Sequence, residues 1–288
     1  MLKSDFIPVA IDQWYERKQK DAKGEFYRKI AGQGPRNNFS QTTQGRYVCD
    51  AEGNLLAFNN NRGPEKIRAM MKAVLKEWKG RENVQPIQAT QLDPEFDVRP
   101  PSNGLVLRVN AKVLSGYEHD PKSWKVAFEQ SISRDNAWFT EQELTQLTQR
   151  IQQGGELPKK LMERVARFHL IDNTRGEPPR WRKDQIKQLK VSIDQGGKIT
   201  GSVHLETADG KRGFVAKLLG VAQTSNGELK RFDLVAKGQF WGRGRFTGHA
   251  PEGKFPLAIA FRMADGTDPA DNMIPHGAKG WVDGYYNN

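Results

Sequence analysis

The chain has 288 residues, of which 36% are hydrophobic and 27% charged, and its formal net charge is +11. This composition excludes a wholly disordered chain, and no apolar run approaches the roughly 18 residues needed to span a bilayer. The length favours two domains. Cys49 is the only cysteine, which excludes an internal disulfide and a thiolate metal cluster.

The N-terminal part predicts a small α/β unit. Residues 6–11 read as a short buried strand, and residues 21–31 read as a helix. Residues 46–49 and 55–58 are separated by a turn signal and predict a hairpin. Residues 64–78 predict the clearest helix, with proline in its first turn and one apolar stripe.

This order resembles the second half of a thioredoxin-like domain. Residues 42–56 look like the β-hairpin of that fold and residues 64–78 like its last helix, so the resemblance covers residues 1–79. The Cys-x-x-Cys pair of that family would precede Met1, and Thr43-Gln44 stands where the family has a cis-proline. The resemblance implies either a degenerate structural unit or a redox protein whose active-site half lies upstream of Met1.

Cys49 itself falls within the predicted hairpin strand and has no resolving partner. Thiol–disulfide exchange by the two-cysteine route is therefore excluded for this chain. Its neighbours include no histidine or lysine that would activate a thiolate, so it reads as a small buried residue.

The first residues, MLKSDFIPVAID, show neither an apolar signal-peptide core nor a small-residue cleavage site. We therefore expect a cytoplasmic protein from the sequence as given. A periplasmic or secreted protein is expected instead if the true N-terminus is missing.

A linker is predicted over residues 80–102, and a β-rich domain over residues 103–288. Alternating apolar residues predict strands near 105–109, 124–128, 189–193, 199–205, 232–236 and 257–263. Asp209-Gly210 and Asn226-Gly227 are hairpin turn signals. The fold class is therefore α+β: a partial thioredoxin-like α/β unit followed by a mainly antiparallel β sandwich or barrel with two helices.

The two helices of this domain have distinct start signals. Thr140 followed by Glu143 predicts a capping box for a helix that runs to about Gln153. Pro158 begins the second helix, which carries Leu161, Met162, Val165, Ala166 and Phe168 on one face.

No catalytic signature is present, and we predict no cofactor and no metal site. No two of the five histidines lie two or four residues apart, so nothing local predicts metal ligation. A metal site could form only after folding, and His169, His249 and Asp172 are the set considered for it.

Residues 159–190 hold ten basic and four acidic side chains, which is over half of the positive excess. Arginine and lysine reach phosphates, so this basic segment predicts an anion-binding surface. Its residues are Arg164, Arg167, Arg175, Arg180, Arg182 and Lys183. The alternative is an amphipathic packing segment with a solvated basic face. Phe240, Trp241, Arg243, Arg245 and Phe246 form a second basic and aromatic cluster, and the glycine-rich run 242–248 reads as a bend in a sheet.

Two polar loops are candidates for function. Asp172, Asn173, Arg175 and Glu177 form a candidate ligand loop, and residues 135–138 form another polar loop beside a strand or helix end. Such segments are as often simple turns, because Asp and Asn bond their own backbone.

The leading hypothesis is a non-catalytic binding or interaction protein. The alternatives are the redox protein described above and a protein that binds anions or nucleic acid through residues 159–190. The partner is unknown. An anionic ligand or an acidic protein fits the charge, and nucleic acid is not favoured, because no recognisable reading module occurs.

Overall fold

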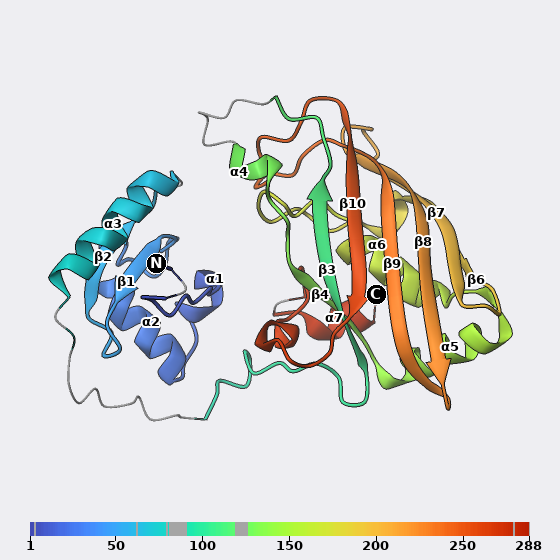
Figure 1. Cartoon of the computed structure of the whole chain (residues 1–288), viewed down its shortest axis with the longest axis horizontal. Helices are drawn as coiled ribbons and strands as arrows, with labels where there is room; N and C mark the ends of the chain where they lie inside the picture. Colours follow the sequence, from blue (N-terminus) through green and yellow to red (C-terminus); the bar gives the residue numbers. More distant parts are fainter. Residues whose placement is uncertain are drawn as a thin grey trace. The chain divides into compact units, whose positions relative to one another are not determined.

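The chain divides into two compact units, Met1–Val98 and Arg99–Asn288 (Figure 1). The structure, a computed structural model, describes residues 1–2, 4–61, 63–78, 80, 91–118, 126–278 and 280–287. The boundary falls within the predicted linker, of which residues 81–90 lie outside the described residues. Part of the predicted linker is hydrogen-bonded to the first unit: the N–H of Asp93 donates to Asp21 Oδ2 at 2.9 Å.

The first unit places three helices around one antiparallel hairpin in its described residues. These elements are α1 (Gln13–Glu16), α2 (Ala22–Gly32), β1 (Arg46–Cys49), β2 (Leu55–Asn59) and α3 (Pro64–Glu77). The predicted helices and hairpin are therefore confirmed. Asp50 Oδ1 fixes the hairpin turn by accepting from the N–H groups of Glu52 and Asn54 at 3.0 and 2.8 Å.

The predicted strand over residues 6–11 is wrong. This segment has no strand pairing, and the side chains of Ile7 and Val9 are 91% and 74% exposed. Pro8 lacks the N–H that a ladder needs, and Asp12 then begins α1 by accepting from the N–H of Trp14 at 3.0 Å. The described part of this unit thus keeps the hairpin and closing helix but not the preceding strand.

The second unit is built on one sheet of eight strands in the order β4-β3-β10-β9-β8-β7-β6-β5, and every neighbouring pair is antiparallel. The strands are β3 (Leu105–Val113), β4 (Asp135–Phe139), β5 (Gly155–Glu156), β6 (Ile186–Ile193), β7 (Lys198–Glu206), β8 (Gly213–Ser225), β9 (Glu228–Trp241) and β10 (Lys254–Met263). The α+β class with a mainly antiparallel β domain is confirmed. Asn226-Gly227 forms the β8–β9 turn, and both residues adopt the positive φ that such a turn requires.

Two helices, α5 (Glu141–Gln153) and α6 (Lys159–His169), cover one face of this sheet (Figure 1). They occupy the place that a second sheet would take in a sandwich. The predicted capping box is present at the start of α5, where Thr140 Oγ1 accepts from the Glu143 N–H and Glu143 accepts from the Thr140 N–H. We call the helix-covered side the inner face of the sheet and the other side the outer face.

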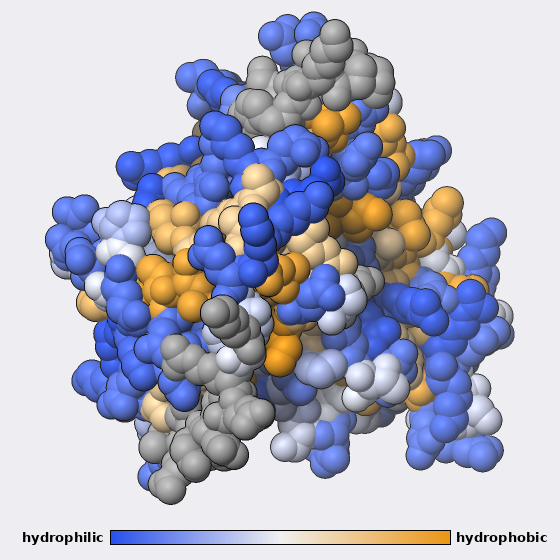
Figure 2. Space-filling model, turned by 60° about the vertical axis from the view of Figure 1, so that its left-hand side comes forward, coloured by the Kyte–Doolittle hydropathy of each residue, from blue (hydrophilic) through white to orange (hydrophobic). Residues whose placement is uncertain are grey.

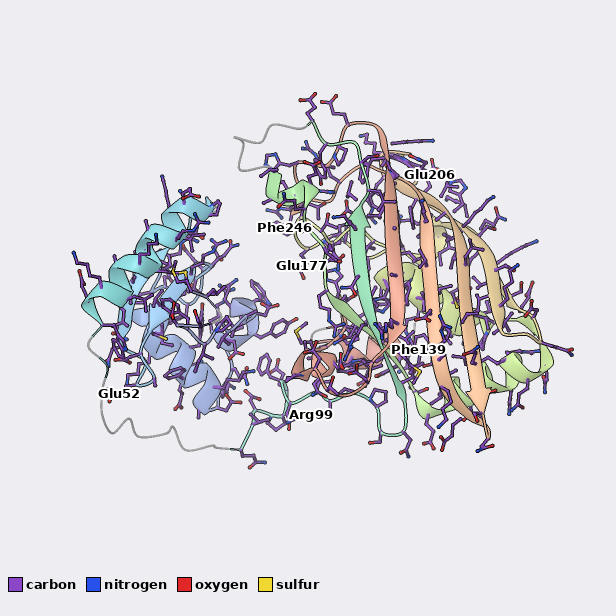
Figure 3. The ribbon with its side chains drawn as sticks, viewed as in Figure 1. Glu52, Arg99, Phe139, Glu177, Glu206 and Phe246 are labelled. Atoms are coloured by element: carbon purple, nitrogen blue, oxygen red, sulfur yellow. The ribbon has the colours of Figure 1, made fainter. Side chains whose placement is uncertain are left out.

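The hydrophobic core lies between the inner face and the two helices. Alternate strand residues supply one half of it, as Leu107, Val109 and Ala111 do from β3. Phe139, labelled in Figure 3, belongs to this core. The helices supply the other half through Leu147 and Val165, among other buried residues.

Two local predictions in this unit are wrong. Residues 126–129 form a short helix, α4 (Val126–Glu129), where alternation predicted a strand, and Trp124 lies outside the described residues. Residues 135–138, predicted as a polar loop, belong to the fully buried strand β4. Distant residues supply hydrogen-bond acceptors there: Asn136 Nδ2 donates to the carbonyl oxygens of Ala270 and Met273.

We call the described residues that follow β10, 264–278 and 280–287, the C-terminal segment. Ion pairs connect it to the edge of the sheet at β3 and β4. Asp271 lies in η2 (Pro269–Asn272) and accepts from Arg108 Nε and Nη2 at 2.8 Å each and from Arg134 Nη2 at 2.6 Å. The neighbouring guanidinium of Arg108, and then that of Arg134, lowers the pKa of the buried Asp271 carboxyl.

We expect Asp271 to make the stability of the protein fall at low pH. Because its folded pKa lies below the unfolded value of ~3.9, its contribution is present above pH ~4 and is lost as the pH falls through the folded value. Urea unfolding of the wild type and of Asp271→Asn should differ most near neutral pH and converge on acidification. A difference that stays constant down to pH ~2 would contradict this linkage.

Candidate functional site

The predicted anion-binding residues do not share one surface. Arg164, Arg167 and Arg175 are buried, whereas Arg180, Arg182 and Lys183 are exposed. Arg182 is paired with Asp184 through two hydrogen bonds of 3.0 and 2.9 Å. The density of basic residues in the sequence therefore overstated the charge that this segment presents to solvent.

Arg164 has a structural role between α6 and its surroundings. Its Nη1 and Nη2 donate to Glu143 at 2.7 and 2.5 Å, and Nη2 also donates to the carbonyl oxygen of Trp138 at 3.0 Å. The guanidinium carbon lies 4.8 Å from the ring centre of Tyr285. The hydrogen bonds to Glu143 raise the pKa of Arg164 although burial opposes this.

Contacts between residues of the predicted ligand loop hold its conformation. Arg175 donates to Asp172 in a buried ion pair and to Tyr117 Oη at 2.9 Å. Asn173 is half-buried, and Glu177 is exposed and lies close to Phe246 in the view of Figure 3. Asp172 and Arg175 therefore hold the loop in shape, and only Glu177 is open to a ligand.

Asp135, His169 and Tyr285 form a buried chain of hydrogen bonds. Nδ1 of His169 lies 3.0 Å from Asp135 Oδ2, and Nε2 lies 2.8 Å from Tyr285 Oη. The carboxylate accepts from Nδ1–H, so with a neutral ring Nε2 accepts from the tyrosine hydroxyl. Burial raises the pKa of Tyr285 far above its usual value.

This chain of hydrogen bonds is not exposed to solvent, because the His169 and Tyr285 side chains are fully buried. Its partners are instead structural: the backbone N–H of Trp138 donates to Tyr285 Oη at 3.2 Å, and that of His276 donates to Asp135 Oδ1 at 2.8 Å. The three residues thus tie α6 and the C-terminal segment to the edge strand β4.

The metal site considered for His169, His249 and Asp172 does not form. His169 is bound to Asp135, Asp172 to Arg175, and the ring of His249 stacks on Phe128 with centroids 5.7 Å apart. No group of three or more metal-ligating side chains is arranged to hold an ion in the part of the chain that the structure describes. His119 lies outside that part.

Cys49 is half-buried in β1. Burial, and then the negative charge of Asp50, raises the pKa of its thiol. This environment disfavours the thiolate, which is the reactive form.

The outer face of the sheet carries a row of lysines that no local pattern revealed. Strand register places Lys190, Ser202, Lys217, Lys237, Ala258 and Lys112 opposite one another across β6, β7, β8, β9, β10 and β3. We call Lys112, Lys190, Lys217 and Lys237 the outer lysine row. Because strands lie ~4.8 Å apart, this row extends over roughly 24 Å.

On β8 and β9, the positions on either side of the outer lysine row are uncharged. One flank brings Leu219 directly opposite Val235, and the other brings Val215 opposite Gln239. Leu219, Val215 and Val235 are 58%, 44% and 40% exposed. The outer face thus combines aliphatic side chains with positive charge. In the separate view of Figure 2, hydrophilic residues predominate and apolar residues form separate areas.

Charge repulsion within the outer lysine row destabilises the folded protein. Lys217 and Lys237 are direct cross-strand neighbours, and like charges in that position are destabilising. Among the described residues, none of the four lysines forms an ion pair with a carboxylate. An external anionic partner would remove this repulsion, which makes the outer face the candidate functional site.

Comparison of the chain with protein-family models, with curated proteins and with solved structures finds no match. In the described residues, no helix combines the length and the apolar character needed to cross a membrane.

Proposed function

We propose that this chain is a non-catalytic binding protein whose second unit binds an acidic protein partner through the outer face of its sheet. The observation that supports this most strongly is the cross-strand pair Lys217 and Lys237 within the outer lysine row. The pair is exposed, and the flanking residues of both strands are neutral.

The side chains around the lysines favour protein over nucleic acid. Binding of single strands uses aromatic platforms, whereas the flanks of the outer lysine row offer Leu219, Val235 and Val215. Aliphatic side chains gain little at a phosphate backbone. They do gain by burial against another protein, where complementary charge adds specificity and a faster encounter.

The first unit is proposed to be a degenerate thioredoxin-like unit. The support is the hairpin of β1 and β2 followed by α3, together with a single cysteine whose thiol pKa is raised. On this proposal the unit contributes no redox chemistry.

Charge reversal on the outer face is expected to abolish binding of acidic peptides. The probe is a peptide of about twenty residues that contains glutamate and leucine, titrated by calorimetry. The double variant Lys217→Glu, Lys237→Glu should bind at least about tenfold more weakly than the wild type, because attraction becomes repulsion. Lys159→Glu, Lys160→Glu is the matched control, since it makes the same charge change on exposed residues of α6.

Two further measurements decide between partner classes. Replacing the leucines of the peptide with serine, or Leu219 with serine in the protein, should weaken binding, because the aliphatic side chains lose their contact. Duplex DNA and vesicles of phosphatidylcholine with phosphatidylserine are the competing probes. Tighter binding of either one, lost in the Lys217 and Lys237 variant, would reject the protein partner; equal binding by all variants would reject the face.

A further inference from the structure

Arg167, in the last turn of α6, is a buried guanidinium that has no carboxylate partner among the described residues. Its Nε donates to the carbonyl oxygen of Trp181 at 3.0 Å. Its buried Nη1 has no hydrogen-bond partner among the described residues, and the group forms no ion pair there. An unpaired donor on a buried charge is costly, so this arrangement needs an explanation.

Other buried arginines of the same region have carboxylate partners, although the Nε atoms of Arg164 and Arg175 also lack a hydrogen-bond partner among the described residues. Arg164, one turn earlier on α6, has two hydrogen bonds to Glu143, and Arg175 is paired with Asp172. Glu163, the acidic residue nearest to Arg167 on α6, is instead paired with Lys159 at 3.8 Å. The partial negative charge at the C-terminal end of α6 stabilises the positive charge of Arg167. Nη1 nevertheless has no hydrogen-bond acceptor among the described residues.

A second guanidinium contacts the same phenylalanine ring as Arg167. The guanidinium carbons of Arg167 and Arg180 are 5.5 and 5.6 Å from the ring centre of Phe168. Arg180 is exposed and stacks on Trp281 at 4.1 Å, and its hydrogen bond to the carbonyl oxygen of Gly277 is long at 3.4 Å. Burial, and then the positive charge of Arg180, lowers the pKa of Arg167.

Arg212 adds a third positive charge around Trp181. Its guanidinium carbon lies 3.9 Å from the Trp181 ring centre, and its Nη1 donates to the carbonyl oxygen of Pro179 at 2.8 Å. Its Nε has no partner among the described residues. The surroundings of Trp181 therefore collect arginines without the carboxylates that accompany Arg164 and Arg175.

We infer that Arg167 and Arg180 form a binding site for a tetrahedral oxyanion, phosphate or sulfate, free or as an ester. An oxyanion bound there would accept from Arg180, whose only hydrogen bond among the described residues is long, and from Nη1 of Arg167. Because Nη1 is buried, the side chains around it must move for the oxyanion to reach it. Guanidinium groups recognise such anions through paired N–H donors. Arg180 supplies the movable, exposed half of the site, and Arg167 the fixed half on α6.

Inorganic phosphate at constant ionic strength should raise the midpoint of thermal unfolding of the full chain. Above the dissociation constant the rise should grow with the logarithm of the phosphate concentration, reaching about 3–5 °C at roughly ten times that constant. Arg180→Gln should lose most of this rise. Arg182→Gln is the matched control and should keep it, because Arg182 is exposed and already paired with Asp184.

Arg167→Gln provides a second readout. Without phosphate this variant should be no less stable than the wild type, because an unpaired buried charge has been removed, and it should not respond to phosphate. Sulfate and a phosphate monoester should act like phosphate, while acetate should not. No rise at constant ionic strength, or an equal rise in Arg180→Gln, would overturn the inference. Lys217→Glu, Lys237→Glu should respond as the wild type does, so this test is independent of the outer face.

Discussion

Replacing Glu143 with glutamine is expected to lower the free energy of unfolding by about 3 kcal/mol. The change removes the charge that accepts two hydrogen bonds from Arg164, so a buried guanidinium is left without its counter-charge. Glutamine keeps an oxygen that can accept the Thr140 N–H, so the helix cap contributes little to the loss. Urea unfolding followed by circular dichroism measures the difference.

Two variants separate the buried pair from helix effects. Glu141→Gln changes the same charge in the first turn of α5, but Glu141 is exposed, so a loss of only a few tenths of a kcal/mol is expected. Glu143→Gln combined with Arg164→Met should be more stable than Glu143→Gln alone, because no uncompensated charge remains. If the double variant loses as much unfolding free energy as Glu143→Gln and Arg164→Met lose separately, added together, the charge pair is not the cause.

Elements with local signals were predictable from the sequence. Thr140 and Glu143 marked the start of α5 because the cap involves only residues three apart. Asn226-Gly227 marked the β8–β9 turn because its backbone angles restrict the residue types. Both signals are independent of the rest of the fold.

Elements that depend on distant partners were not predictable. Asp135 and Asn136 look like loop residues, yet they lie in a buried strand, where the segment from Ala270 to His276 supplies hydrogen-bond partners for them. Residues 6–11 show the converse, since an apolar run without a partner strand stays exposed. Sequence patterns record polarity but not the partner that decides burial.

The same distinction between local signals and distant partners applies to the candidate sites. Arg164 and Arg175 were predicted to bind anions because they lie in a basic segment, but Glu143 and Asp172 pair with them inside the fold. The outer lysine row was missed because Lys112 and Lys237 are far apart in the chain. Only strand register brings them into one row, and register is set by the pairing of the whole sheet.

Asp135→Ala is expected to destabilise the second unit by about 3 kcal/mol and to release its C-terminal segment. The carboxylate accepts from His169 Nδ1 and from the backbone N–H groups of Asn136 and His276, so two buried donors and one part-buried donor lose their acceptor. His169 then no longer positions Tyr285, which accepts from the backbone N–H of Trp138 on the edge strand β4.

Release of that segment gives a signature that simple loss of stability does not. Hydrogen exchange under native conditions should quicken at Trp138 and over α7 (Val282–Tyr286) more than in β8 and β9, because local opening precedes global unfolding. Asp268→Ala is the matched control: it removes a half-exposed carboxylate from the same segment and should leave exchange at Trp138 unchanged. Uniform acceleration across the whole sheet in Asp135→Ala would show that Asp135 supports global stability only. Acceleration confined to β4 and α7 would identify the Asp135, His169 and Tyr285 chain as the link that keeps the sheet edge covered.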